Sequence, residues 1–480
     1  MTTTARGLPA GTTLSAAASA IRVGAATSTG LVEQCIAAAD ACDPGLGIFL
    51  DRYRDSAREA ALIADAGLAA GKVVGPLHGL PLGIKDIITT REGPTTAQSL
   101  VNGPAAMSGD ACVVRRLRDS GAIVMGKLST MEFAVGAPDA SKPFPVPRNP
   151  WNPERWAGGS SSGSGSGVAT GAVLGALGTD TGGSIRIPAA FCGVTGLKPT
   201  FGRVPKSGCI PLGYSLDHVG PIARSARDCA LLLAVLAGPS ADDPSSAREP
   251  VSDYIDALTG DLEGVRIGVD RLTRIGGGSE DPALEGLFNR ALDALQAQGA
   301  RVTEIELPYY SELTTAEGIV LVSEAMAYHR ENLRRRWMDF GAPTREYLAR
   351  GAFYSASDLV QAQRARTVGR RALSNVFTQV DLIATPTTSG VAPLLDDLFA
   401  EGLEPATSFY TGYWNATGCP ALSVPMGFNA EGMPLGLQIA GPPFGESCVL
   451  RAGDAYQRAT DWHLRVQSPE LGGRTSWHSI

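Results

Sequence analysis

Hydrophobic residues recur at helical spacing near the start of the chain and then fall into short apolar runs separated by helical segments. Leu31, Cys35 and Ala38 predict a helix over residues 28–42, capped by Ser28 or Thr29, and residues 56–71 repeat the pattern. The further elements expected are an apolar run over 82–88, a helix over 111–120 between Asp110 and Gly121, a strand over 122–127, a helix-like run over 168–177, a strand over 265–269, a helix over 283–298, a strand over 301–307, a helix over 312–337, strands over 381–385 and 421–425, an apolar segment over 434–440 and a last helix from about 446. This alternation predicts an α/β fold with a mixed β-sheet covered by helices on both faces.

No segment has the composition of a domain linker, and no internal repeat is present. We therefore expect one domain over residues 1–480, with a helical part over about 1–75, a core over 76–240 and the remaining sheet over 260–470. Residues 238–250 are rich in Pro, Ser and Asp, which is typical of a surface loop.

Charge and cysteine usage narrow the class of protein. The chain has 41 Lys and Arg against 48 Asp and Glu, a formal net charge of −7, with no run of five or more like charges. Nothing in this balance favours nucleic acid or a membrane surface as a partner. Eight scattered cysteines form no CxxC pair, and the first residues lack an apolar leader. We expect a cytoplasmic monomer or homodimer that binds a small molecule, without nucleic acid or membrane.

Glycine is enriched locally, and the richest stretch, residues 158–189, carries the most informative chemistry. A flexible linker would not continue into an apolar run and a second glycine-rich turn that ends in Ser184, Ile185 and Arg186. A phosphate-binding loop needs a lysine after the glycines, and a dinucleotide fingerprint needs a preceding strand; neither is present. The sequence GSSSG at 159–163 matches the serine elbow of α/β-hydrolases, but no strand precedes it.

The same stretch resembles the signature of the amidase signature family. The matching motifs are GGSSSG at 158–163, GTDTGGS at 178–184 and IRxP at 185–188, with HGLPLGIKD at 78–86, MEFA at 131–134, GxxGLKPT at 193–200, NxxGxP at 415–420 and PxGxQ at 434–438 outside it. The resemblance covers residues 15–465 and implies the α/β fold of that family, hydrolysis of amides, and no cofactor or metal.

By this resemblance Ser184 is the nucleophile, Ser160 carries the proton and Lys85 is the base. In the family, a cis peptide bond precedes the residue that corresponds to Ser160. A lysine acts as a base only when it is neutral, and burial favours the neutral form. Lys85 lies in the apolar run over 82–88, which fits that requirement. Two other lysines, Lys127 and Lys198, are expected on solvated surfaces.

Successive backbone N–H groups of Thr181, Gly182, Gly183 and Ser184 are the expected oxyanion hole. Ser161, Asp180 and Arg186 are expected to support the site: Ser161 by hydrogen bonding, Asp180 by ordering the turn and Arg186 by bracing the loop.

Aromatic residues near the expected substrate mouth favour hydrophobic or aryl amides, with carbamates and esters as further substrates. They are Phe144, Trp151, Phe409, Tyr410, Tyr413 and Trp414.

Three alternatives stay open for the function. One is the glutaminase subunit of a tRNA-dependent amidotransferase, in which a tyrosine, an arginine and an aspartate hold glutamine. Arg366 could match that arginine, but Glu317–Gly318 and Ser408 stand at the other two positions, which disfavours glutamine. The others are a hydrolase of small aliphatic or urea-derived amides and a non-catalytic binding protein on the same scaffold.

Overall fold

Eleven strands form one mixed sheet in the computed structural model, which describes residues 6–102, 109–276, 280–399 and 407–467. The order across the sheet is β1-β3-β2-β4-β6-β5-β10-β11-β9-β7-β8. The strands are β1 (Phe49–Arg52), β2 (Pro81–Lys85), β3 (Ile123–Leu128), β4 (Gly175–Asp180), β5 (Thr195–Lys198), β6 (His218–Ala223), β7 (Arg266–Val269), β8 (Arg301–Glu304), β9 (Leu382–Pro386), β10 (Ala421–Phe428) and β11 (Pro434–Ala440). One sheet thus joins strands from both halves of the chain.

Strand β2 is central to the position of the site. It pairs in parallel with β3 on one side and with β4 on the other, with Leu82 opposite Gly175 and Ile84 opposite Leu177. Because parallel strands end at the same edge of a sheet, Lys85 at the end of β2 lies beside the end of β4, where Asp180 stands. A residue pair 95 positions apart is brought together in this way.

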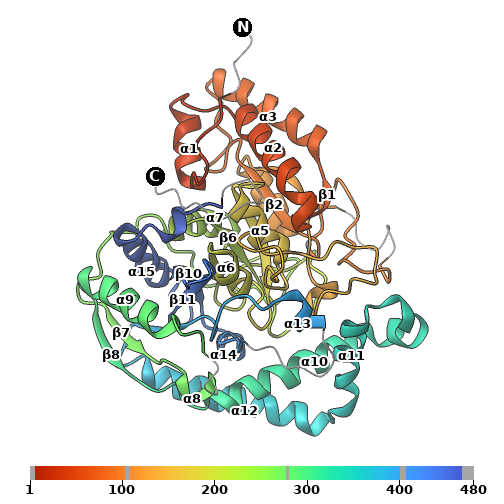
Figure 1. The fold of residues 1–480 in the computed structure, drawn as a ribbon, viewed down its shortest axis with the longest axis vertical. Helices are drawn as coiled ribbons and strands as arrows, with labels where there is room; N and C mark the ends of the chain where they lie inside the picture. The colour runs from red at the N-terminus through yellow and green to blue at the C-terminus, as the bar shows by residue number, and fades with distance from the viewer. Residues whose placement is uncertain (1–5, 103–108, 277–279, 400–406, 468–480) are drawn as a thin grey trace.

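Helices cover both faces of the sheet, as expected from the alternating pattern (Figure 1). The helices are α1 (Leu14–Arg22), α2 (Ser28–Leu46), α3 (Arg54–Ala69), α4 (Cys112–Asp119), α5 (Ser162–Thr170), α6 (Arg186–Cys192), α7 (Ala226–Leu236), α8 (Thr273–Gly276), α9 (Leu284–Ala297), α10 (Tyr310–Arg335), α11 (Ala342–Ala349), α12 (Ala356–Val376), α13 (Leu395–Phe399), α14 (Gly412–Thr417) and α15 (Glu446–Ala459).

Neighbouring residues of β4 show how the two faces are filled. Leu177 packs in the cluster that contains α7 and α15, whereas Ala176 packs in the cluster that contains α2 and α5. Successive side chains of a strand point to opposite faces. Helix α5, which begins at Ser162 within the GSSSG sequence, therefore covers one face of the strand that leads to Asp180.

Most element positions agree with the sequence pattern: β11 spans the expected residues 434–440, and α15 begins at Glu446. The expected helix-like run over 168–177 is divided, because α5 ends at Thr170 and β4 begins at Gly175. Gly171 has a positive φ of 76°, a left-handed conformation that ends the helix and that glycine adopts without strain. The cap of α2 is Thr27, not Ser28 or Thr29, and the Asp110 side chain does not cap α4.

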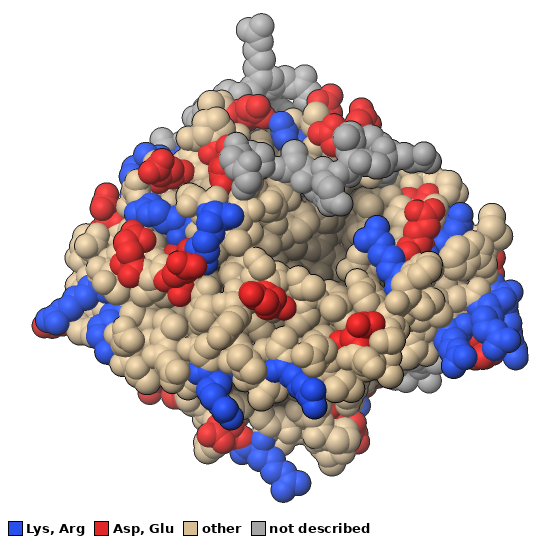
Figure 2. Space-filling view, turned by 90° about the horizontal axis from the view of Figure 1, so that it is seen from below, with Lys and Arg blue, Asp and Glu red and all other residues tan. Residues whose placement is uncertain are grey.

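Charged side chains of both signs are spread over the face seen in Figure 2, around a hollow in the surface. Within the described ranges, no helix combines the length and apolar character needed to cross a membrane.

Candidate active site

Lys85 lies in the interior of the molecule, with its amine directed at hydroxyl groups. Its Nζ donates to Ser160 Oγ at 2.7 Å and to Thr179 Oγ1 at 2.8 Å, and the residue is 0% exposed. Burial lowers the pKa of Lys85 to about 7, although the nearby carboxylates of Asp180 and Asp217 act to raise it. A substantial fraction of the molecules therefore carries a neutral amine at pH 7.

Ser160 and Ser184 line one cavity of about 510 Å³. The peptide bond between Gly159 and Ser160 is cis, as the resemblance implies. The next residue joins the two serine segments, since Ser161 N–H donates to the Ser184 carbonyl oxygen at 3.2 Å. Ser161 Oγ also donates to the Thr179 carbonyl oxygen at 3.2 Å, which links this turn to β4. Both serines thus line the space that a substrate would fill.

The turn from Thr181 to Ser184 presents free backbone donors. Among the described residues, no hydrogen-bond acceptor is recorded for the N–H groups of Gly182, Gly183 or Ser184. Gly183 has a φ of +141°, and a Cβ at this position would meet Thr411 Oγ1 and, at 2.7 Å, Ile187 Cδ1. Only glycine fits here, and its neighbours Gly182 and Ser184 line the cavity.

Asp180 and Arg186 form a buried ion pair behind the turn. Arg186 Nη2 lies 2.9 Å from Asp180 Oδ1, and both side chains are 0% exposed. Asp180 Oδ2 also accepts from the Ile185 N–H, and Asn415 Nδ2 donates to Asp180 Oδ1 at 2.8 Å. Burial alone would raise the pKa of Asp180, but the Arg186 guanidinium holds it well below its usual range. Asp180 and Arg186 therefore contact the turn and each other outside the cavity, and neither side chain lines it.

Replacing Asp180 by asparagine is expected to lower the free energy of unfolding by about 3–5 kcal/mol, because it leaves the buried Arg186 charge without a counter-charge. The matched control is Asp381→Asn, which breaks the exposed pair with Arg266 and should cost less than about 1 kcal/mol. Urea unfolding of the two variants measures the difference. Equal losses would show that burial of the Asp180 pair has no special effect on stability.

Most of the aromatic residues expected at the substrate mouth do not line the cavity. Tyr410, Tyr413 and Trp414 pack in a core cluster with Leu313 and are at most 1% exposed. Trp151 is buried as well, and its Nε1 donates to the Cys192 carbonyl oxygen. Phe144 does not line the cavity either. Residues 412–417 form α14, which packs between α10 and the sheet. The rings of Tyr413 and Trp414 therefore fill the core.

Phe409 does line the cavity, together with aromatic and apolar residues from several elements. The apolar lining residues are Met131, Ala134, Val135, Ala137, Trp156, Ile187, Leu212, Leu321, Pro343, Leu398 and Phe409.

Three polar residues of the cavity were not found from the sequence: Glu346 and Tyr347 from α11, and Arg350 at the start of the short helix η3 (Arg350–Phe353). They lie more than 150 positions after Ser184 and carry no motif, so only the packing of α11 over the cavity reveals them. Arg366, the arginine weighed for glutamine, is instead buried and donates to the Ala416 carbonyl oxygen at 3.0 Å.

A buried carboxyl also lies behind the turn. Glu317 of α10 has an oxygen close to Gly182, and its Oε1 has no hydrogen-bond partner among the described residues. Burial, followed by the charge of Asp180, raises the pKa of Glu317 to about 8. The group is therefore largely neutral at pH 7 and adds little negative charge near the turn.

The expectation that Lys127 and Lys198 lie on solvated surfaces is wrong, since both are 0% exposed. Lys127 pairs with Asp86 at 3.0 Å, and Lys198 Nζ donates to the carbonyl oxygens of Pro199 and Cys419. The flanking sequence gave no sign of Asp86 or Cys419 as partners, because both come from distant segments of the chain.

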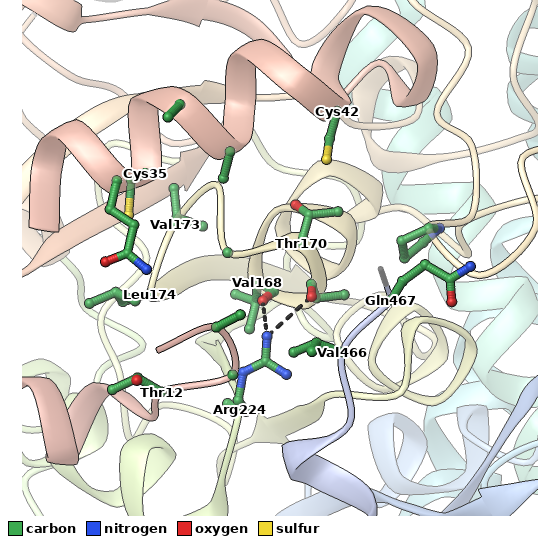
Figure 3. Close-up of a pocket in the computed structure, with 18 of the residues that line it drawn as sticks. Thr12, Cys35, Cys42, Val168, Thr170, Val173, Leu174, Arg224, Val466 and Gln467 are labelled. Atoms are coloured by element: carbon green, nitrogen blue, oxygen red, sulfur yellow. Dashed lines mark hydrogen bonds between the residues drawn. The ribbon is translucent and has the colours of Figure 1, made fainter. Parts of the chain in front are cut away.

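A second cavity of about 360 Å³ is lined by residues of α2 and α5, among others (Figure 3). Its walls are mainly apolar. Arg224 extends into it and donates to the carbonyl oxygens of Val168 and Ala169 at 2.9 and 3.1 Å, which caps the end of α5. None of the predicted site residues lines this cavity.

The fold and the buried lysine–serine pair define an amide hydrolase, and comparisons with known proteins agree. A family model described as Amidase matches residues 30–450. The chain therefore belongs to the amidase signature family and is an amidohydrolase that acts on C–N bonds.

Among its relatives, a glutamyl-tRNA(Gln) amidotransferase subunit from Roseiflexus sp. (strain RS-1) is 42% identical over 96% of this chain and 98% of its own length. Two solved structures are also similar. One, reported as a vestigial protein complex that reveals the origins of an s-triazine catabolic enzyme, has a TM-score of 0.85 at 31% identity and covers 93% of this chain and 98% of its own. The other, a bacterial aryl acylamidase, has a TM-score of 0.83 at 26% identity and covers 94% and 96%.

One expectation is overturned by these relatives. We expected a monomer or homodimer that binds only a small molecule, without nucleic acid. Curated relatives that are 40–42% identical to this chain are named as a subunit of an enzyme and carry a tRNA in that name. Net charge failed as a guide here because it averages over the whole surface and says nothing about a local contact to a partner.

Proposed function

We propose that Ser184 is the nucleophile of an amidase in which Ser160 and Lys85 relay the proton. The observation that carries this proposal is the buried hydrogen bond from Lys85 Nζ to Ser160 Oγ at 2.7 Å. Ser160 and Ser184 line the same cavity. A serine hydroxyl needs a base to attack an amide, and a buried lysine with a pKa of about 7 supplies one.

The reaction runs in two halves. Ser184 Oγ attacks the amide carbon as its proton passes to Ser160 and the Ser160 proton passes to Lys85. The oxyanion that forms accepts hydrogen bonds from free N–H groups among Gly182, Gly183 and Ser184. The C–N bond then breaks, and the proton returns from Lys85 through Ser160 to the leaving nitrogen. Water attacks the acyl-enzyme by the same relay, which releases the acid and restores Ser184.

Glutamine is the first candidate substrate. In this proposal the chain is the subunit of an amidotransferase for glutamyl-tRNA that releases ammonia from glutamine. Two observations support it. Relatives that are 38–42% identical over almost the whole chain carry that name. The cavity also holds an acidic and a basic side chain, Glu346 and Arg350, which suit the α-ammonium and α-carboxylate of an amino acid amide. Arg366, the one residue that could match a glutamine-binding arginine, does not line the cavity, so Glu346 and Arg350 are the charged groups that would hold glutamine there.

A hydrophobic or aryl amide is the second candidate. The walls beside the two serines are apolar, with Met131, Trp156 and Phe409 among them. Such walls favour a substrate with a ring or a branched chain over a polar one. The similarity to an aryl acylamidase structure supports the same candidate.

A substrate panel separates the two candidates. Glutamine, acetamide, a nitroanilide and an aryl carbamate are assayed by release of ammonia or amine, with Ser184→Ala as the blank. Turnover of glutamine supports the amidotransferase function, and turnover of the anilide alone supports the second candidate. Failure of every substrate to exceed the blank would contradict the amidase assignment.

Replacing Arg350 by alanine is expected to raise KM for glutamine at least about tenfold with a smaller effect on kcat, because a charge-assisted contact to the carboxylate is lost. The anilide, which has no carboxylate, should be unaffected. The matched control is Arg345→Ala: Arg345 is on the preceding helix α11, but its guanidinium donates to the Phe340 carbonyl oxygen and it does not line the cavity. An unchanged KM in Arg350→Ala would remove this residue from glutamine recognition.

A further inference from the structure

The free N–H groups of the turn are useful to an oxyanion only if their peptide planes are held in place. Such donors work because they are oriented before the reaction begins. One side chain binds this turn from outside the signature segment: Thr411 Oγ1 donates to the carbonyl oxygen of Gly182 at 2.6 Å. Thr411 is 0% exposed and stands 229 positions away in the chain.

This bond fixes the peptide between Gly182 and Gly183. In a trans peptide the C=O and N–H point in opposite directions. With the Gly182 oxygen held on Thr411, the Gly183 N–H is directed away from Thr411. The Thr411 hydroxyl also occupies the space that a Gly183 side chain would need, so the two residues are matched in shape.

The hydroxyl of Thr411 does not cap the helix that begins after it. Thr411 is the N-cap residue of α14, where a threonine side chain commonly accepts a hydrogen bond from its own helix. No such cap bond is formed here. Its backbone is fixed independently, because the Thr411 carbonyl oxygen accepts from Arg186 Nη1 at 2.9 Å and from the Trp414 N–H at 3.1 Å.

We infer that Thr411 is a positioning residue that orients the Gly183 N–H toward the oxyanion through its bond to the Gly182 carbonyl. This inference deepens the proposed function and rests on it. Thr411 is not among the residues that line the cavity, whereas Gly182 and Ser184, the two neighbours of Gly183, are.

The test compares Thr411→Val, which keeps the shape and loses the hydroxyl, with Thr411→Ser, which keeps the hydroxyl. We expect kcat to fall about 10- to 100-fold in Thr411→Val with KM nearly unchanged, less than for removal of a donor outright. Thr411→Ser should recover most of the rate. Thr417→Val is the control, since its hydroxyl donates to the Tyr413 and Trp414 carbonyl oxygens of α14 and not to the turn. Rates are taken per active site, counted by covalent labelling of the serine.

A boronic acid that matches the substrate of the panel gives a second measurement, because its tetrahedral adduct places an oxygen in the position of the oxyanion. Its affinity should fall in Thr411→Val by the same factor as kcat/KM, a change that a merely structural role would not produce. Equal kcat/KM in wild type and Thr411→Val, or equal loss in the Val and Ser variants, would overturn the inference. If Ser184→Ala instead keeps full turnover, the proposed function fails and the inference fails with it.

Discussion

Ser184→Ala should lose amide hydrolysis by about 10⁴-fold or more, to the level of the assay blank. The nucleophile of a serine hydrolase acts as one unit with its base, so its loss removes nearly all of the covalent pathway. The fold should survive, because no hydrogen bond from the Ser184 side chain is recorded in the described part of the chain, and the Ser184 carbonyl oxygen still accepts from Ser161. Ammonia or amine release and circular dichroism of the same preparation give the two measurements.

The control for this prediction is Ser166→Ala. Ser166 is a buried serine of the same signature segment, but its hydroxyl donates to the Arg148 carbonyl oxygen, away from the cavity. Its activity should stay within about twofold of wild type. Retained turnover in Ser184→Ala would show that another residue attacks the amide.

Lys85→Met is expected to lower kcat/KM by about 10²- to 10⁴-fold, the usual effect of losing a general base. In the wild-type enzyme, kcat/KM should rise with pH and level off above about pH 8. The sign follows from the role: Lys85 must lose its proton to act, and burial lowers the pKa of Lys85 to about 7. Below that pH the protonated form dominates, and kcat/KM should fall about tenfold per pH unit.

A second buried lysine makes this test stricter. Burial, with the charge of Arg186, lowers the pKa of Lys198 to about 7 as well, so Lys198 could give a similar pH profile. Its amine, however, contacts neither Ser160 nor Ser184 but the carbonyl oxygens of Pro199 and Cys419. Lys198→Met should therefore keep the rise with pH. A flat profile in Lys198→Met, with a normal profile in Lys85→Met, would assign the base to Lys198.

Local sequence predicted the parts of the site that lie within one segment or at the end of one strand. Lys85 could be located because its apolar run forms a strand with no solvated side. Gly183 was predicted only as one of four successive backbone donors, and its positive φ and crowded Cβ position come from the structure. The family motif added the roles of Ser160 and Ser184.

The substrate pocket could not be predicted in this way. The sequence cannot show whether the rings of Tyr413 and Trp414 line a cavity or fill the core. In the structure, the packing of α14 against α10 places both rings in the core. Arg350 and Glu346 have no motif, and only the fold of α11 over the cavity shows them.

The sequence by itself determined the alternation of strands and helices, the family and the residues of the proposed relay, because these depend on local periodicity and on a continuous motif. The tertiary structure decided what the cavity presents to a substrate and which distant groups hold the turn, such as Thr411 on the Gly182 carbonyl. The physical reason is that burial, the lowered pKa of Lys85 and the orientation of backbone donors arise from contacts between segments far apart in the chain. No local pattern of residues records such contacts.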